Sequence, residues 1–301
     1  MTRRSSTLFQ TERETMDQFE QYRPLMFSIA YRMLGSVTEA EDILQNAYLR
    51  YREMPVGSIA SPKAFLSTVV TRLCLNHLQS ARLQRESYLG PWLPEPVLTE
   101  TDPQSPTSQA EQLESISMAF LVLLERLTPV ERAVFLLREV FDYPYSDIAE
   151  IIGKDEVSCR QILSRAKKFI AGSRPRFTPS TEQHHQLLQQ FLGAVEEGDL
   201  DGLTQLLASD VTLSTDGGGK VRGAATRTVQ GQEAVARFMI ASQRFIQATF
   251  TSEITQVNGE PAILLRIDGH PFAVVSVTIA QQHIVEVRVV GNPEKLKHLE
   301  E

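Results

Sequence analysis

The residues whose chemistry stands out lie along one face of a helix predicted to begin near residue 156. Their hydroxyl, amide and guanidinium groups are those that hydrogen-bond to base edges, and their cations are those that hold phosphates. Residues 157–176 contain six Lys or Arg and no acid in a chain of net charge −7, so positive charge is concentrated here against the overall trend. The face consists of Ser158, Arg160, Gln161, Ser164, Arg165 and Lys168. It is suited to a DNA major groove, although a pair of packed helices with a solvated charged face would show the same spacing.

Capping residues predict the helices that hold this face. Thr128 and Glu131 form a capping box at the start of one helix, and Ser146 is expected to cap a short second helix. Gly153 can end that helix in a sharp turn, and Asp155 can cap the next one. The pattern indicates a helix-turn-helix whose last helix buries Cys159, Leu163, Ala166 and Ile170.

A second basic face lies on the long helix that is predicted to follow Ser61-Pro62 and to extend to about residue 86. Residues 63–85 contain four basic side chains and no acid, which makes this face a second candidate nucleic-acid surface. An ordinary amphipathic helix is the alternative. Two helices are expected before it, over residues 19–34 and 36–52, after a frayed segment at 1–15. The candidate residues are Lys63, Arg72, Asn76, Arg82 and Arg85.

Composition places the chain among soluble globular proteins. Its 301 residues suffice for roughly two or three domains. Two distant Cys and six scattered His give no zinc-type spacing, so we expect neither a metal nor another cofactor. No apolar run is long enough to span a membrane, and a reducing cytoplasm is the expected location.

Residues 91–114 are predicted to form a linker, because they are rich in Pro, Ser, Thr and Gln and contain five acids and no base. The only Trp of the chain, Trp92, lies between prolines in this segment. A large aromatic side chain held in this way is expected to dock on another part of the protein.

After residue 175 the pattern changes to two helices, at 181–197 and 200–208, followed by strands from residue 211 onward. Asn258-Gly259 and Asp268-Gly269 are typical of type I′ turns, so consecutive antiparallel strands are expected at 254–257, 262–267 and 272–279. In the last strand, at 284–290, alternation predicts that Arg288 points outward. Helices followed by a curved antiparallel sheet indicate an α+β cone that encloses a pocket.

Three short motifs and the order of the domains resemble one branch of the extracytoplasmic-function sigma factors, in which a SnoaL-like domain of the NTF2 fold follows the sigma domains. The motifs are Trp92, Leu93, Pro94, Glu95 and Pro96; Asp216, Gly217, Gly218, Gly219 and Lys220; and Asn292, Pro293, Glu294, Lys295 and Leu296. The resemblance implies sigma domain 2 at residues 15–90, the linker at 91–114, sigma domain 4 at 115–175 and the SnoaL-like domain at 181–301. The expected fold is therefore two all-α sigma domains, the second a helix-turn-helix, and a C-terminal α+β cone.

The same resemblance implies a role in promoter-specific initiation with core RNA polymerase. The helix with Glu41, Asp42 and Gln45 would dock on the β′ clamp helices, where Asn46 replaces a common acid, and the polymerase β flap would be a second contact. The helix after Ser61-Pro62 would recognise the downstream promoter element, and the face from Ser158 to Lys168 the upstream element.

The acidic C-terminal domain is expected to fold back on the sigma domains and to hold the Trp92 linker through the three motifs, regulating sigma activity in cis. No separate anti-sigma factor is then expected. An unknown small ligand in the cone could bias this arrangement only by binding one state more tightly than the other.

Two other classes of protein remain open at this point. One is a helix-turn-helix regulator that binds duplex DNA without polymerase and has a ligand-sensing domain. The other is a SnoaL-type cyclase or isomerase, with Asp216, Asp268, His270 or Arg288 as the acid or base. The clamp-type helix favours the sigma factor, and we predict no catalytic residue.

Overall fold

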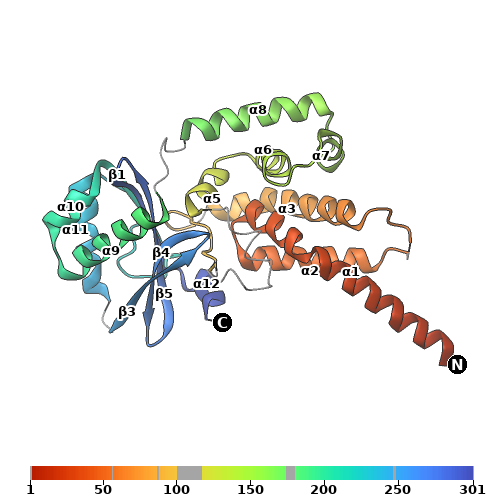
Figure 1. The fold of residues 1–301 in the computed structure, drawn as a ribbon, viewed down its shortest axis with the longest axis horizontal. Helices are drawn as coiled ribbons and strands as arrows, with labels where there is room; N and C mark the ends of the chain where they lie inside the picture. Colours follow the sequence, from red (N-terminus) through yellow and green to blue (C-terminus); the bar gives the residue numbers. More distant parts are fainter. Residues whose placement is uncertain are drawn as a thin grey trace. The chain divides into compact units, whose positions relative to one another are not determined.

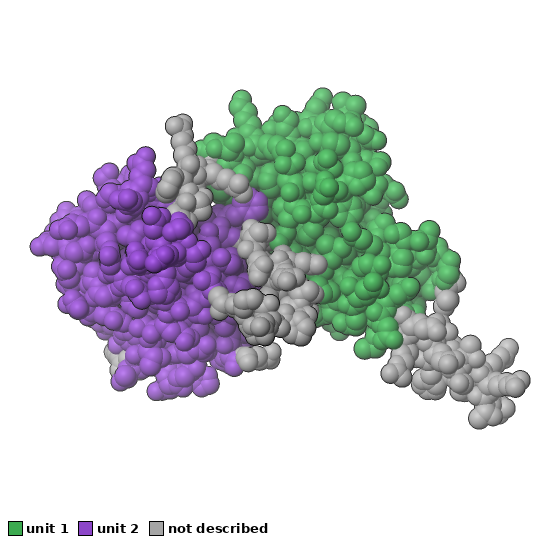
Figure 2. Space-filling view, viewed as in Figure 1, with its two compact units in different colours: residues 1–83, 105–112, 123–173 green, residues 84–104, 113–122, 174–301 purple. Residues whose placement is uncertain are grey.

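The computed structural model describes residues 2–55, 57–86, 88–99, 117–173, 180–246 and 249–300. The chain divides into two compact units (Figure 2). Within the described ranges, unit 1 holds residues up to 83 and residues 123–173, and unit 2 holds residues 84–99, 117–122 and 180–300. Each unit has a buried apolar core of its own.

Three helices form the first half of unit 1: α1 (Thr2–Leu34), α2 (Val37–Arg52) and most of α3 (Pro62–Glu86) (Figure 1). The expectation of a frayed start was wrong, because α1 begins at Thr2. Gly35 ends α1 with a φ of 69°, and the hydroxyl of Ser36 accepts a hydrogen bond from the Glu39 amide at 3.1 Å. The turn between α1 and α2 therefore forms where the sequence predicted it.

The second half contains the end of α5 (Met118–Glu125), α6 (Pro129–Phe135), the π-helix η1 (Leu136–Val140), α7 (Tyr145–Ile152) and α8 (Glu156–Ser173). The capping box of Thr128 and Glu131 is confirmed. Gly153 ends α7 in the left-handed region, at φ 66°, and Asp155 accepts from the Ser158 amide at 2.8 Å. These contacts confirm the predicted helix-turn-helix, whose α8 buries Cys159, Leu163, Ala166 and Ile170.

The predicted cap at Ser146 was wrong. Helix α7 already begins at Tyr145, after Pro144, and the hydroxyl of Ser146 donates to the carboxylate of Asp147 at 3.0 Å. Pro144 occupies the position before the helix with its φ fixed by the ring, and no side chain caps α7.

Buried polar contacts join the two halves of unit 1. The hydroxyls of Ser67, on α3, and Tyr143, before α7, lie 2.5 Å apart. The guanidinium of Arg132, on α6, donates to the carbonyl of Met33 at the end of α1 and lies 2.7 Å from the carboxylate of Glu125. The helices before the linker are thus held to the helix-turn-helix by polar as well as apolar contacts.

Unit 2 is built on a six-stranded sheet: β1 (Leu207–Asp216), β2 (Val229–Gln230), β3 (Phe250–Val257), β4 (Glu260–Ile267), β5 (His270–Ala280) and β6 (His283–Val290). The strand order is β2-β1-β6-β5-β4-β3; β1 is parallel to β6 and the other neighbours are antiparallel. Asn258-Gly259 and Asp268-Gly269 have positive φ at both positions, which confirms the two predicted type I′ turns.

Helices α9 (Thr181–Glu197), α10 (Leu200–Leu206) and α11 (Gln232–Ser242) cover one face of the sheet (Figure 1). Leu188, Phe191, Leu203 and Val235 from these helices share one buried cluster with the strands. The second helix is shorter than the predicted 200–208, because β1 already begins at Leu207. The chain ends in the short helix α12 (Pro293–Leu296) and a 3-10 turn at Lys297–Leu299.

Arg288 corrects the simple alternation rule. It points away from the helix-covered face, but only 2% of it is exposed. Its guanidinium donates to the Thr278 hydroxyl at 2.9 Å and to the Glu286 carboxylate. Alternation predicts which face of a strand a residue occupies, whereas other segments of the chain decide whether that face is covered.

Candidate nucleic-acid interface and linker clasp

Helix α8 presents the predicted basic face to solvent. Arg160, Gln161, Ser164, Arg165 and Lys168 are all exposed. Ser158 is half-buried, and its hydroxyl donates to Asp155 at 2.7 Å. This bond, together with the Ser158 amide, lowers the pKa of Asp155. Five of the six predicted residues are therefore accessible to DNA, while Ser158 takes part in the helix cap.

Nearby acids hold two of the arginines in place. Arg160 lies 2.8 Å from Glu156 and over the ring of Tyr145, 4.6 Å from its centroid. Arg165 lies 3.7 Å from Glu131. Such exposed ion pairs contribute little to stability. Both guanidinium groups can therefore leave their carboxylate partners and bind a DNA base or a phosphate at small cost in free energy.

The sequence reasoning did not single out Val157, which is 61% exposed at the start of α8. An exposed β-branched residue at this end of the helix offers an apolar contact of the type that recognises a thymine methyl group. In the sequence, the indication was its position directly before Ser158, the first residue of the predicted polar face.

The second basic face is only partly accessible. Lys63, Arg72 and Asn76 are exposed on α3, but the guanidinium of Arg72 is occupied. Its Nε donates to the carbonyl of Ile151 at 3.0 Å, and its Nη2 donates to that of Glu150 at 2.8 Å. We call this pair of bonds, from α3 to the end of α7, the Arg72 joint. The side chains of Arg82 and Arg85 lie outside the described residues.

Helix α2 carries the predicted polymerase-binding residues on its outer side. Asp42, Gln45 and Asn46 are exposed, and Glu41 is half-buried beside Arg23, at 2.6 Å. The Asn46 amide donates to the carbonyl of Asp42 at 2.8 Å. The four residues therefore occupy one continuous polar face.

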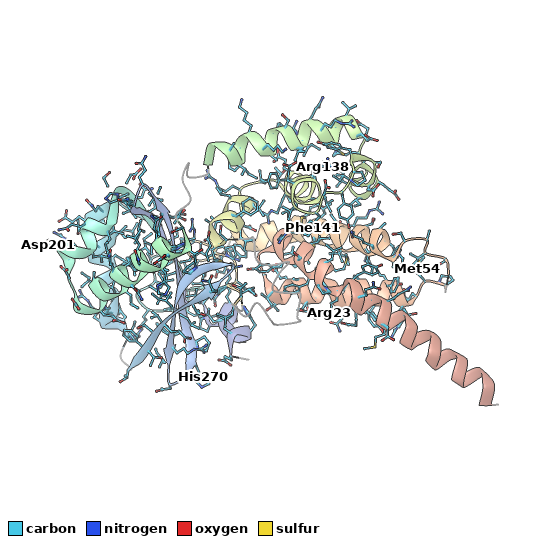
Figure 3. All side chains as sticks on the ribbon, viewed as in Figure 1. Arg23, Met54, Arg138, Phe141, Asp201 and His270 are labelled. Carbon is cyan, nitrogen blue, oxygen red and sulfur yellow. The ribbon has the colours of Figure 1, made fainter. Side chains whose placement is uncertain are left out.

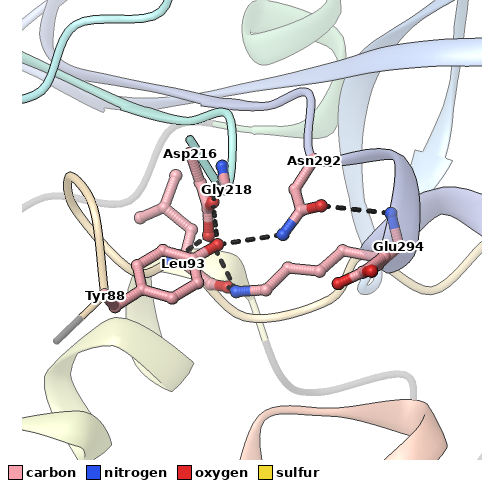
Figure 4. A network of polar contacts seen from close by, with 7 residues as sticks. Tyr88, Leu93, Asp216, Gly218, Asn292 and Glu294 are labelled. Atoms are coloured by element: carbon pink, nitrogen blue, oxygen red, sulfur yellow. Dashed lines mark hydrogen bonds and ion pairs between the residues drawn. The ribbon is translucent and has the colours of Figure 1, made fainter. Parts of the chain in front are cut away.

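The three short motifs meet in unit 2, around the carboxylate of Asp216 (Figure 4). Its Oδ1 accepts from the Tyr88 hydroxyl at 2.5 Å and from the Gly218 amide at 3.1 Å. Its Oδ2 accepts from the Leu93 amide at 2.8 Å and from the Lys295 ammonium at 2.7 Å. The carboxylate is fully buried, and its four donors satisfy it.

Lys295 contributes the opposite charge, from α12. Its ammonium also donates to the carbonyl of Leu93 and lies 3.9 Å from the centroid of the Trp92 ring. Asn292 caps α12 and donates to the Tyr88 hydroxyl at 2.9 Å. We call this network the linker clasp; its members are Tyr88, Trp92, Leu93, Asp216, Gly218, Asn292 and Lys295.

Further contacts continue the clasp along the linker. His298 lies 2.6 Å from the carbonyl of Pro96, and the Asn258 side chain accepts from the Val97 amide at 3.1 Å. The hydroxyl of Thr99 accepts from the Gly259 amide at 3.0 Å. Leu93, Pro94, Glu95 and Pro96 are buried and Trp92 is half-buried, so the linker is packed onto unit 2 from residue 88 to residue 99.

Charge and burial shape the clasp. Burial and the hydrogen bond to Asp216 raise the pKa of Tyr88, which keeps its hydroxyl a donor. Lys220 forms an exposed ion pair with Glu294, and this contact lowers the pKa of Glu294. The sequence reasoning missed Tyr88, His298, Asn258 and Thr99. Of these four, only Tyr88 had a signal in the sequence: it stands two residues before Gly90-Pro91, where regular structure is expected to end.

The residues considered for catalysis are not brought together. Asp268 and His270 are exposed at the β4–β5 hairpin, and Figure 3 shows His270 at its tip. Arg288 lies on the sheet face opposite the helices, and Asp216 is saturated by the clasp. These four residues therefore form no acid–base site.

Comparison with known proteins identifies the class. A model of sigma-70 region 2 matches residues 18–84, and a model of sigma-70 region 4 matches residues 117–170. The two regions define a bacterial transcription initiation factor of the sigma-70 type. The linker clasp involves residues between them.

Relatives over nearly the whole chain define the family. The chain is 36% identical over 290 residues to the ECF RNA polymerase sigma factor SigJ of Mycobacterium tuberculosis, covering 93% of this chain and 92% of SigJ. It is 30% identical over 284 residues to the probable ECF sigma factor SigI of the same species, covering 92% and 93%. The chain belongs to the extracytoplasmic-function family of RNA polymerase sigma factors.

The fold agrees with this family. The crystal structure of SigJ superposes with a TM-score of 0.73 at 34% identity, covering 93% of this chain and 97% of SigJ. The predicted fold is confirmed: two helical sigma domains and a C-terminal NTF2-like α+β domain with a curved sheet. A sigma factor binds core RNA polymerase and promoter DNA in transcription initiation. Among the residues that the structure describes, no helix has both the length and the apolar character of a membrane span.

Proposed function

We propose that this ECF sigma factor directs initiation at specific promoters under the control of its own C-terminal domain. The observation that carries the proposal is the linker clasp. It fixes residues 88–99, which connect the two sigma regions in the sequence, through Asp216 and Lys295 of the C-terminal domain. When residues 88–99 are held, the part of the linker that can still move is shorter. The two sigma regions can then adopt fewer separations and orientations, because the held segment no longer contributes its conformational freedom.

DNA recognition is assigned to the two basic faces. On α8, Arg160, Gln161 and Arg165 would read base edges in the upstream element, with Ser158, Ser164 and Lys168 completing the contact to bases and phosphates. On α3, Lys63, Arg72 and Asn76 would contact the downstream element, together with Arg82 and Arg85. The exposure of α8 and the overall negative charge of the chain support a factor whose affinity for DNA comes mainly through polymerase.

The outer face of α2 is proposed to bind the β′ clamp helices of core polymerase, and the region that contains α8 to bind near the β flap. The assignment of α2 is supported by its continuous polar surface, formed by Glu41, Asp42, Gln45 and Asn46. The protein would act in the cytoplasm without a cofactor, a catalytic activity or a separate anti-sigma factor.

The Arg72 joint gives the proposal a conformational requirement. As long as the Nε and Nη2 of Arg72 donate to the carbonyls of Ile151 and Glu150, this edge of its guanidinium is not available to DNA. Binding of the downstream element through the Nε–Nη2 edge of this residue therefore requires that α3 and α7 separate. In this proposal, the form of unit 1 in which the Arg72 joint is closed is a resting form.

Run-off transcription with bacterial core polymerase on a promoter library tests the proposal. Full-length protein is compared with Tyr88→Phe, which removes the hydroxyl contacts to Asp216 and Asn292 and leaves the sigma regions unchanged. Tyr22→Phe, on α1, is the matched control. We expect promoter-specific transcripts from all three proteins and a changed yield from Tyr88→Phe alone.

Two results would contradict the proposal. Equal yields from the wild type and Tyr88→Phe would remove the regulatory role of the clasp. Tight binding of duplex promoter DNA by the protein alone, with no initiation, would indicate a conventional helix-turn-helix regulator.

A further inference from the structure

A cavity of about 130 Å³ lies inside the cone of unit 2. Its walls are mainly apolar and include Phe191 and Val195 from α9, Met239 from α11, and Ile263 and Val275 from the sheet. An apolar cavity of about 150 Å³ can stay dry and bind benzene. By volume and lining, this cavity fits one aromatic ring or a hydrocarbon of similar size.

The loop that follows β1 forms one wall of this cavity. Asp216, Gly217, Val221 and Ala224 all line it. A Cβ atom on Gly217 would lie 2.7 Å from the Cβ of Ala224 and 3.1 Å from that of Val221, so the loop is folded tightly against its own cavity-lining residues. No side chain larger than hydrogen fits there without displacing the wall.

The same loop touches the linker clasp on its other side. A Cβ on Gly218 would lie 2.5 Å from the Asn292 amide nitrogen, and one on Gly219 would lie 3.1 Å from the Leu89 side chain. Asp216 itself holds Tyr88, Leu93 and Lys295. Three consecutive glycines thus fill a narrow layer between the cavity and the linker, and little space is left to absorb a movement of either.

We propose that the cone is a binding site for a small uncharged molecule with one aromatic ring, and that the Asp216–Lys220 loop transmits its occupancy to the linker clasp. A ring that fills the cavity supports Val221 and Ala224 from inside and therefore stabilises the clasped form. A ligand shifts a conformational equilibrium only through such a difference in affinity between the two states. The inference rests on the proposed function only in its last step, in which the clasp affects transcription.

The chain contains its own reporter of the clasp. Trp92 is the only Trp, and the Lys295 ammonium lies 3.9 Å from the centroid of its ring. A change in the clasp changes this cation–aromatic contact, and therefore the Trp92 emission. Binding and coupling can be measured on the same full-length sample.

Toluene is the probe, with benzoate as a charged ring of similar size and 1-methylnaphthalene as a ring system too large for the cavity. We expect toluene to raise the Tm of the full-length protein by about 3 °C at tenfold excess over its Kd, and to change the Trp92 emission with the same saturation curve. Benzoate and 1-methylnaphthalene should produce neither effect.

Val195→Phe fills the cavity from α9 and should weaken toluene binding by roughly tenfold or more. Val229→Phe is the control, because Val229 packs against the same core without lining the cavity. Ala273→Leu, from the opposite wall, replaces Val195→Phe if that variant does not fold.

Three outcomes would overturn the inference: no saturable effect of toluene, an undiminished effect in the folded cavity-filled variant, or binding that leaves the Trp92 emission unchanged. A failure of the proposed function is distinct from these. Toluene would then bind and change the emission, while Tyr88→Phe would transcribe like the wild type.

Discussion

Two polar junctions, one in each unit, join segments that are distant in the sequence. In unit 1, the Arg72 joint pairs an exposed guanidinium with two neutral backbone carbonyls. In unit 2, the linker clasp pairs Lys295 with Asp216, whose side chains are 8% and 0% exposed. The first junction leaves its charge in contact with water, and the second removes both charges from water.

This difference sets how easily each junction opens. When the Arg72 joint opens, water replaces the carbonyl acceptors, so the net loss is about that of one or two ordinary hydrogen bonds. If Asp216 or Lys295 loses its partner, the remaining charge is buried without compensation, which costs several kcal/mol. The fold therefore combines a junction suited to repeated opening in the DNA-binding part with a durable one that holds the linker.

The largest predicted effect is at the clasp. Asp216→Ala leaves the Lys295 ammonium buried without its carboxylate, and we expect the free energy of unfolding of unit 2 to fall by about 3–5 kcal/mol. Urea denaturation followed by Trp92 fluorescence measures it. Lys220→Ala, which removes the exposed ion pair with Glu294, is the control and should change the stability by less than about 1 kcal/mol. Similar losses in both variants would show that burial does not distinguish the two pairs.

Acid should weaken the unit that holds the durable junction. His184, on α9, is 7% exposed, and its Nε2 is buried without a hydrogen-bond partner among the described residues. Burial lowers its pKa from 6.5 to about 4, because the imidazolium form would lose its hydration. Between these two values the unfolded chain binds a proton that the folded unit does not, so stability falls as the pH drops, by up to about 3 kcal/mol.

Denaturation at several pH values from 7 to 4 tests this prediction, with His184→Leu as the comparison. Glu260 acts in the opposite direction, because burial raises its pKa to about 6 and its folded form gains a proton as the pH drops. The difference between the wild type and His184→Leu isolates the histidine. If the two proteins lose stability in parallel, His184 is not the origin of the acid sensitivity.

Two left-handed glycines extend the comparison to the backbone. Gly218, in the clasp, has a φ of 58°, and a Cβ there would lie 2.5 Å from the Asn292 side chain. Gly57, in unit 1, has a φ of 78° but nothing within 4 Å of such a Cβ. We expect Gly218→Ala to cost about 2–3 kcal/mol and Gly57→Ala about 1 kcal/mol, since only the first adds a collision to the strain.

Thermal unfolding of both glycine variants measures these costs. The Asn292 side chain caps α12 and bonds Tyr88, so it cannot move aside without loosening the clasp. Equal shifts in Tm would mean that Asn292 yields freely and that the clasp is less rigid than proposed.

The sequence was sufficient for features that depend on neighbouring residues. The capping box at Thr128 and Glu131, the end of α7 at Gly153 and the Asn258-Gly259 turn each follow from the side-chain or backbone preferences of a few consecutive residues. The basic face of α8 follows equally from helical spacing. For the same reason, the positions of the strands were nearly correct, although β3, β4 and β5 begin two to four residues earlier than predicted.

Features that depend on distant residues were not accessible in this way. Nothing near Arg72 in the sequence indicates that α7 places two free carbonyls beside it, and alternation alone cannot show that Arg288 is covered. The clasp is intermediate. The resemblance grouped its three motifs. The ion pair of Asp216 with Lys295 and the hydrogen bond from Tyr88 to Asp216 are seen only in the folded structure.

The smallest predicted change in stability is at the Arg72 joint. Arg72→Ala removes both hydrogen bonds to the end of α7, and because the carbonyls of Glu150 and Ile151 can turn to water, we expect a loss of about 1 kcal/mol or less in unit 1. The kinetic effect should be larger: amide hydrogen exchange in α7 should become faster, while exchange around the clasp stays unchanged. Arg72→Lys keeps the charge but not the planar group that reaches both carbonyls, and should give an intermediate rate. A stability loss as large as that of Asp216→Ala would show that the joint is a structural contact and not one that opens for DNA.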